Sequence, residues 1–361
     1  MKVTQLWLTD FRNYTSAELC PAPDGMTVLI GANGQGKTNL LEAVSWLATL
    51  ESFRGAPDEA LVRGGARRAV IRAQADRDGR ALLVEAELVV AGQDRVQVNR
   101  QPLRRARDLL GAIRVTLFSP DDLALVKGSP GGRRRFLDQA LVALSPRHDQ
   151  LRGDLERVLR QRASLLKASG SRPGAGLLAS LDVWDAKLAE VGEEVADARA
   201  SLVGALAALA TGAYQELAGE SVPVTLSYQR SWEGNLAIAL LASRNDDLRR
   251  GITTVGPHRD DLVLGLGGLP SRHHASQGEA RSLALALRLA VHRAVAEEVG
   301  SAPVLLLDDV FSELDNDRAA ALLAHLPAGQ CLLTTTGEVP FQAQPDLVIR
   351  VDGGRLVAFQ K

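Results

Sequence analysis

Residues 31–38 read GANGQGKT, and this short segment restricts the possible folds more than any other feature of the chain. It follows an apolar run at 27–30 and precedes a segment in which Leu40, Val44 and Leu47 recur at helical spacing. A glycine-rich loop between a buried strand and a helix binds phosphate through backbone N–H groups and the positive end of the helix. We therefore expect an α/β fold with a nucleotide site at this loop.

The residues of the loop have distinct expected roles. The loop backbone that surrounds the phosphates is supplied by Gly31, Ala32, Asn33, Gly34, Gln35 and Gly36. Lys37 reaches the β- and γ-phosphates and supports catalysis, and Thr38 is a ligand of Mg²⁺. Lysine is scarce here, with six among the 42 basic residues, so Lys37 stands out. ATP and Mg²⁺ are the expected cofactors.

A second apolar run, 304–307, ends in the paired carboxylates of Asp308 and Asp309. This is the pattern of a Walker B strand: Asp308 holds Mg²⁺ through a water, and Asp309 orients or deprotonates the attacking water as the catalytic carboxylate. Any buried strand can end in two solvated aspartates. The P-loop in the same chain favours the nucleotide-binding interpretation.

Spacing indicates the subclass, because Lys37 and Asp308 are 271 residues apart. A large insertion between the halves of one site suggests an ABC-type head, which needs a signature motif that caps the nucleotide of a second copy. The candidate signature residues are Ser276, Gln277, Gly278 and Glu279, just before an expected helix at 278–299. Ser-x-x-Glu is also a capping box, which needs no ligand, and the two interpretations are compatible.

Asp315 then has the spacing of a D-loop residue. A strand at 331–336 ends in threonines, where ABC proteins often carry a switch histidine.

The middle of the chain is expected to be a mostly helical insertion at 119–250. It separates an ATPase lobe with the P-loop at 1–118 from a lobe with the signature and Walker B motifs at 251–361. Apolar residues at alternating spacings of four and three predict helices at 146–168 and 177–217 that form an antiparallel arm with a coiled-coil-like seam. An ordinary helical bundle is the alternative.

Charge and composition restrict the partners. The net charge is −1, with 42 basic and 43 acidic residues, so DNA binding requires a local patch. The densest basic cluster consists of Lys127, Arg133, Arg134 and Arg135. A solvated helix end explains this cluster more simply in an arginine-rich chain. Aromatic residues make up 4%, which disfavours a base-stacking platform for single strands and favours sequence-independent contact with a duplex backbone.

The sequence also predicts the compartment. No run approaches the roughly 20 apolar residues of a membrane span. The first residues begin a strand-like pattern directly, without the apolar segment of a signal peptide. The two cysteines, Cys20 and Cys331, have no metal or redox spacing. We expect a cytoplasmic protein without a membrane partner.

The order of the motifs resembles that of the bacterial RecF family, relatives of the SMC and Rad50 ATPase heads. The matching motifs are FRNY at 11–14, GANGQGKT, FSPDDL at 118–123, GPHRDD at 256–261, SQGE and LLLDDVFSELD. The resemblance covers nearly the whole chain and implies an α/β, ABC-type P-loop ATPase head with a helical insertion. It also implies that Arg12 and Asn13 approach the phosphates or base of the nucleotide, and that 118–123 occupies the Q-loop position without its glutamine.

The resemblance further implies an ATP-dependent homodimer that closes on duplex DNA or a gap junction, in DNA replication, recombinational repair and the SOS response. With RecR and RecO it would help RecA replace the single-strand-binding protein. A weak, DNA-stimulated ATPase would drive release. Two other classes stay open: the ATP-binding subunit of a membrane ABC complex, and a scaffold in which ATP only switches an interaction surface. The long insertion and the absent switch histidine speak against the first.

Overall fold

The computed structural model describes residues 1–77, 79–169, 174–337 and 343–359, which form two compact units. The head unit consists of Met1–Leu123, Leu209–Val222 and Ser276–Lys361, and the arm unit of Ala124–Ala208 and Pro223–Ala275. Each unit is therefore assembled from segments that are distant in sequence.

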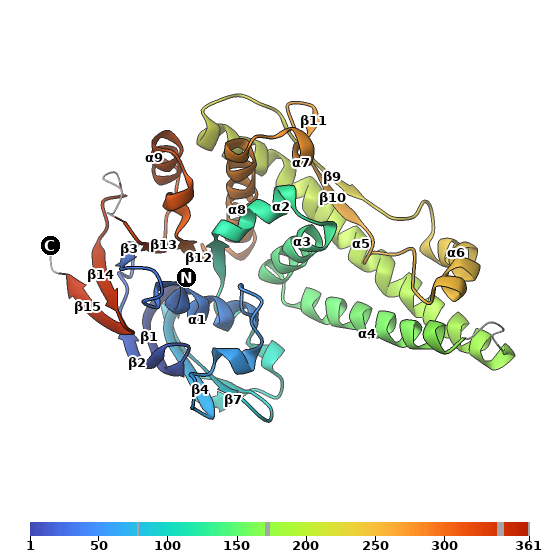
Figure 1. The fold of residues 1–361 in the computed structure, drawn as a ribbon, viewed down its shortest axis with the longest axis horizontal. Coiled ribbons are helices and arrows are strands. Elements are labelled where there is room, and N and C mark those ends of the chain that lie inside the picture. Colours follow the sequence, from blue (N-terminus) through green and yellow to red (C-terminus); the bar gives the residue numbers. More distant parts are fainter. Residues whose placement is uncertain (78, 170–173, 338–342, 360–361) are drawn as a thin grey trace. The chain divides into compact units, whose positions relative to one another are not determined.

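The head unit has a central sheet that joins both ends of the chain (Figure 1). In spatial order its strands are β15 (Arg355–Phe359), β14 (Leu347–Asp352), β3 (Gly25–Ile30), β13 (Gln330–Thr335), β12 (Val304–Asp308) and β8 (Val115–Phe118). All neighbours pair in parallel except β14 and β15. Strands β12 and β13 are buried throughout, as parallel strands covered on both faces are.

A second, antiparallel sheet of the head unit packs against helix α1 (Lys37–Thr49). Its strands, in spatial order, are β2 (Tyr14–Leu19), β1 (Lys2–Phe11), β4 (Arg68–Arg77), β5 (Arg80–Val89), β6 (Arg95–Val98) and β7 (Gln101–Pro102). Alternating burial along β4 shows that one face of this sheet is covered. Leu40, Val44 and Leu47 of α1 share one core with Ile71 of β4 and Leu306 of β12. Helix α1 is thereby fixed by apolar contacts to both sheets.

The remaining helical elements of the head unit are short, apart from α8. They are η1 (Asp58–Leu61), η2 (Ala106–Leu109), η3 (Pro120–Asp122), α8 (Gln277–Val299), η4 (Val310–Glu313) and α9 (Asn316–Ala324). Helix α8 buries Leu283, Leu287 and Val295, together with the imidazole of His292. Nδ1 of His292 lies 3.0 Å from Oγ1 of Thr116, and its Nε2 has no hydrogen-bond partner among the described residues.

We expect His292 to make the head unit sensitive to mild acid. Burial lowers its pKa from 6.5 to about 4, with a smaller effect of Arg293. Between these values the unfolded chain binds a proton that the folded chain excludes, so the free energy of unfolding falls as the pH falls. The expected loss is about 2 kcal/mol from pH 7 to pH 5. Urea unfolding at both pH values should show a smaller loss in His292→Leu; an equal loss in both proteins would contradict this assignment.

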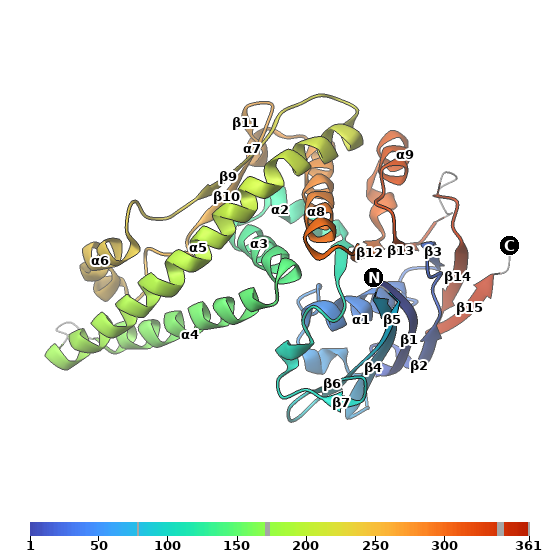
Figure 2. The ribbon, with the colours of Figure 1, turned by 180° about the vertical axis from the view of Figure 1, so that it is seen from behind.

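The arm unit contains the predicted helices, and the ranges expected at 146–168 and 177–217 are confirmed. Its helices are α2 (Leu123–Lys127), α3 (Pro130–Leu144), α4 (Arg147–Ala168), α5 (Ala175–Ala218), α6 (Leu236–Arg250) and α7 (Ser271–His274). The end of α5, from Leu209, belongs to the head unit. A small sheet orders β11 (Leu269–Pro270), β10 (Asp261–Leu266) and β9 (Val224–Gln229). Helices α4 and α5 lie side by side in opposite directions (Figures 1 and 2). Leu181, Leu188, Val195 and Leu202 of α5 are buried at seven-residue spacing, as the expected seam requires.

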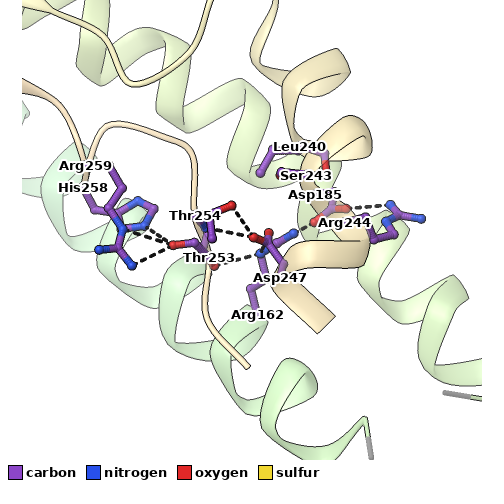
Figure 3. A network of polar contacts seen from close by, with 10 residues as sticks. All are labelled: Arg162, Asp185, Leu240, Ser243, Arg244, Asp247, Thr253, Thr254, His258 and Arg259. Carbon is purple, nitrogen blue, oxygen red and sulfur yellow. Dashed lines mark hydrogen bonds and ion pairs between the residues drawn. The ribbon is translucent and has the colours of Figure 1, made fainter. Parts of the chain in front are cut away.

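A buried ion-pair network joins three helices of the arm unit (Figure 3). Arg162 of α4 is fully buried; its Nε donates to Asp185 of α5 over 2.6 Å, and its Nη1 lies 2.8 Å from a carboxylate oxygen of Asp247 of α6. The same Nη1 donates to Thr253, and Arg244 pairs with Asp185. Removal of one member would leave a buried charge unpaired, so the network fixes how α4, α5 and α6 pack.

Helix α5 departs from one expectation. It contains an 18-residue window that is long and apolar enough to cross a membrane by length and composition alone. The sequence led to no such expectation. The window is 39% buried, and Leu202, Leu206, Ala210 and Tyr214 of the same helix are at most 5% exposed, so one face of α5 packs within the protein.

Candidate nucleotide-binding site

The GANGQGKT loop leaves the carboxyl end of β3 and enters α1, as expected from the sequence. Gly36 is the N-cap of α1 and has a φ of 112°, and Gly34 has a φ of 78°. A Cβ at Gly36 would lie 2.7 Å from the side-chain amide of Asn13 and 2.8 Å from the hydroxyl of Tyr14. Conformation and space therefore both demand glycine at position 36.

The ammonium group of Lys37 lies inside this loop. Its Nζ donates to the carbonyl oxygens of Gly31 and Ala32 over 2.7 and 2.8 Å, and the residue is 6% exposed. Burial lowers the pKa of Lys37, while the nearby carboxylates of Asp309 and Asp308 act in the opposite direction. The ammonium group of Lys37 thus supplies the positive charge that would attract a phosphate to the loop, and it partly offsets the charge of the two nearby carboxylates.

Hydrogen bonds join Thr38 to the Walker B strand across 270 residues of sequence. Oγ1 of Thr38 and Oγ1 of Thr334 each donate to Oδ1 of Asp308 over 2.8 Å. Burial raises the pKa of Asp308, although both hydroxyl groups favour its ionised form. A hydroxyl and a carboxylate are hard oxygen ligands of the kind Mg²⁺ prefers. Thr38 and Asp308 therefore fit the ion expected from the sequence.

Asp309 has a strained backbone, with φ at 48° and ψ at 30°. For a residue other than glycine this conformation costs about 1–2 kcal/mol, and such strain concentrates at functional sites. The N–H of Asp309 donates to Oγ1 of Thr334 over 2.9 Å. Thr334 thus contacts both acidic residues. The sequence did not indicate this role for Thr334, because it depends on the register that pairs this residue with Asp308.

Arg12 and Asn13 also lie beside the loop, with different partners. Two nitrogens of Arg12 donate to the fully buried carboxylate of Glu42 in α1, over 2.8 and 2.7 Å. The amide of Asn13 donates to the carbonyl of Gln35 over 2.9 Å. Asn13 therefore supports the loop directly, whereas Arg12 acts on α1 through Glu42, which the sequence analysis did not identify. Their contact with a nucleotide stays a prediction.

The signature residues form a second group, at the start of α8. Ser276 is the N-cap: its Oγ accepts from the N–H of Glu279 over 3.3 Å, and the carboxylate of Glu279 accepts from the N–H of Ser276 over 2.7 Å. The capping box is therefore present. Ser276 and Gln277 are exposed, and none of the described contacts of Ser276 or Gly278 is with the P-loop. Asp315 caps α9, accepting from the N–H of Arg318 over 2.9 Å.

Three of the four residues in the basic cluster expected to contact DNA form hydrogen bonds or ion pairs within the arm unit. Lys127 donates to backbone carbonyls at 271–275, and Arg134 donates to the carbonyl of Asp260 over 2.7 Å. Arg133 is 4% exposed and forms a two-bond ion pair with Asp261. Because Arg133 is buried and paired, the expected phosphate contact does not fit it. Arg135 is exposed, and for it a DNA contact stays a prediction.

The GPHRDD segment, to which the sequence assigned no role, has structural contacts in the arm unit. Nε and Nη2 of Arg259 donate hydrogen bonds to the carbonyl oxygen of Thr253, and Nε2 of His258 lies 3.2 Å from the same oxygen (Figure 3). Burial lowers the pKa of His258 to about 4, which favours its neutral form. Asp260 is 1% exposed and accepts from the hydroxyl of Tyr228 over 2.6 Å. These contacts fix the connection between α6 and β10.

Comparison with known proteins agrees with this geometry. Residues 2–348 match the model of the RecF/RecN/SMC N-terminal domain. The chain is 47% identical to a DNA replication and repair protein RecF of Frankia alni, over 95% of this chain and 96% of that protein. It is 48% identical to a RecF of Streptomyces avermitilis, over 93% of each.

Solved structures show the same fold. A structure described as the recombination mediator protein RecF-ATP in the RecFOR pathway is 29% identical, with a TM-score of 0.91 over 99% of this chain and 98% of that one. An SMC head bound to a domain of ScpA is 16% identical, with a TM-score of 0.59 over 100% and 98%, and shares the fold alone. The expected ABC-type head is thereby confirmed, and the chain belongs to the RecF family of DNA replication and repair proteins.

Proposed function

We propose that this chain is an ATP-dependent DNA-binding protein of recombinational repair that works as a homodimer. The observation that carries the proposal is the separation of two groups of residues. Lys37 and Thr38 follow the glycine-rich loop, and Thr38 donates to Asp308 of β12, which precedes Asp309. Ser276 is exposed at the start of a different helix. A second copy can add its signature residues to the first nucleotide, and each dimer then holds two.

The residues divide the chemistry between them. The loop backbone and Lys37 bind the phosphates of ATP, and Thr38 and Asp308 hold the metal. When bound, Mg²⁺ neutralises charge on the β- and γ-phosphates. Asp309, held by Thr334, orients the attacking water or accepts its proton. The hydroxyl of Ser276 and the N–H of Gly278, both from the second copy, contact the γ-phosphate.

The partners follow from the family. Relatives carry the name DNA replication and repair protein RecF, and solved relatives are described as recombination mediators of the RecFOR pathway. We infer that the closed dimer holds duplex DNA near single-strand gaps in the cytoplasm, and acts with RecR and RecO to load RecA. Slow, DNA-stimulated hydrolysis would open the dimer. Because the net charge is −1, binding should depend on local cations and weaken steeply with salt.

Sedimentation velocity tests the proposal directly. The protein alone should sediment as a monomer, the protein with ATP and Mg²⁺ as a dimer, and the dimer should co-sediment with a gapped duplex. A chain that stays monomeric with ATP bound would contradict the shared site. Recovery with membranes would instead favour an ABC complex, the alternative that the family assignment disfavours.

A further inference from the structure

The side chain of Arg318, in the first turn of α9, lies against the backbone of Gly278 in the signature segment. A Cβ built on Gly278 would lie 2.6 Å from Nη1 and 2.9 Å from Cζ of Arg318. Gly278 does not have the positive φ that commonly requires glycine. Its missing side chain instead leaves room for the guanidinium group.

Asp315 holds the same guanidinium group. The carboxylate accepts the backbone N–H of Arg318 over 2.9 Å and also accepts from Nη1. Nε of Arg318 is buried and has no hydrogen-bond partner among the described residues of the head unit. The side chain of Arg318 is 32% exposed, and Asp315 holds its guanidinium group beside Gly278.

A second arginine joins the same two segments. Nη1 of Arg281, in α8, donates to the carbonyl of Glu313 over 2.8 Å, and Nη2 pairs with the carboxylate of Glu313. The segment 310–315 follows Asp309 directly. Arg281 and Arg318 thus join α8 to the segment that directly follows Asp309, and Oγ of Ser312 in this segment donates to the carbonyl of Asp309 over 2.8 Å.

We propose that Arg318 is a positioning residue that fixes the signature segment to Asp315, so that both face the nucleotide of a second copy as one rigid surface. The consequence for dimerisation rests on the proposed function; the positioning itself does not. Arg318 acts through Gly278 and Asp315, and the P-loop of its own chain does not depend on it.

Hydrogen exchange of the nucleotide-free protein tests the positioning. In Arg318→Ala we expect amide exchange at 276–282 and 310–316 to rise about fivefold, because the contact that orders both segments is lost. Arg249→Ala is the matched control: Arg249 of α6 also pairs with an aspartate three residues earlier, Asp246, and both side chains of this pair are exposed. The control should leave both segments unchanged. Unchanged exchange in Arg318→Ala would overturn the proposal.

Gly278→Ala provides an independent arm of the same test. The added methyl group would displace the guanidinium and should raise exchange in the same two segments. In the double variant with Arg318→Ala, the glycine substitution should add little, because residues in direct contact act non-additively. Full additivity would show that Arg318 and Gly278 act independently and would refute the link.

Self-association with ATP and Mg²⁺ then tests the consequence. Arg318→Ala should dimerise about tenfold more weakly, while its affinity for ATP, measured at protein concentrations that keep it monomeric, stays unchanged. ATP hydrolysis should reach its full rate only at a higher protein concentration, and the KM for ATP should be unchanged. A variant that dimerises like the wild type overturns the proposed consequence. A wild type that does not dimerise refutes the proposed function, and the exchange data still decide the role of Arg318.

Discussion

Lys37→Met is expected to abolish nucleotide binding. The substitution keeps the length of the side chain but removes the ammonium group, which lies 2.7 and 2.8 Å from the carbonyls of Gly31 and Ala32 and is the charge nearest the expected phosphates. In the ATP-bound protein the ammonium group would donate to oxygens of the β- and γ-phosphates instead. Charge-assisted hydrogen bonds contribute about 1.5–3 kcal/mol each, so the loss of two such bonds to the phosphates should weaken ATP binding at least about a hundredfold. Titration with a fluorescent ATP analogue measures the change.

The matched control is Lys167→Met, which removes an exposed lysine from α4. It should bind ATP like the wild type, and thermal unfolding should show that both variants are folded. Near-normal affinity in folded Lys37→Met would exclude the assigned role of this loop.

Ser276→Arg should leave ATP binding intact and prevent ATP-dependent dimerisation. Ser276 is exposed and does not contact the P-loop of its own chain, so the first half of each site is untouched. The long side chain would occupy the space that the γ-phosphate of the second copy needs. Because neither shared site can close, ATP-dependent dimerisation should weaken at least about a hundredfold relative to the wild type. Sedimentation velocity with ATP and Mg²⁺ provides the readout.

Ser276→Asp separates the two roles of this residue. Aspartate is as good an N-cap as serine, so α8 should begin normally. Its negative charge would repel a γ-phosphate, and dimerisation should still be lost. A Ser276→Asp protein that dimerises would show that Ser276 only caps the helix, and a Ser276→Arg protein that dimerises would exclude the signature assignment.

The nucleotide site was largely predictable because its motifs are local. Glycines, Lys37 and Thr38 must be adjacent in sequence to form the loop, and paired acids at a strand end are equally visible. Thr334 and Glu42 were not predictable. A threonine in an apolar strand matters here only because the strand register places it beside Asp308, and Glu42 only because Arg12 lies against α1. Such roles arise from tertiary pairing, which has no motif.

The arm shows the same limit. Seven-residue apolar spacing predicted its long helices, since that pattern directly reflects a buried seam. Arginine is abundant in this chain, so the sequence does not indicate which arginine side chains are buried. Arg162 and Arg133 look like surface cations in the sequence, yet each is buried beside an aspartate from a distant segment. The same ambiguity made Arg133 a candidate for DNA contact.

The position of β3 between β13 and β14 has a consequence for biosynthesis. Residues 25–30 are made early, but both neighbours of this strand come from 330–352. At 5–20 residues per second, roughly 15–60 s of translation separates them. During that time two strand edges of the nascent chain lack their partners and invite pairing with other chains. A high contact order also slows folding after release. The insertion that gives the protein its arm thus lengthens the interval during which β3 lacks both of its neighbours.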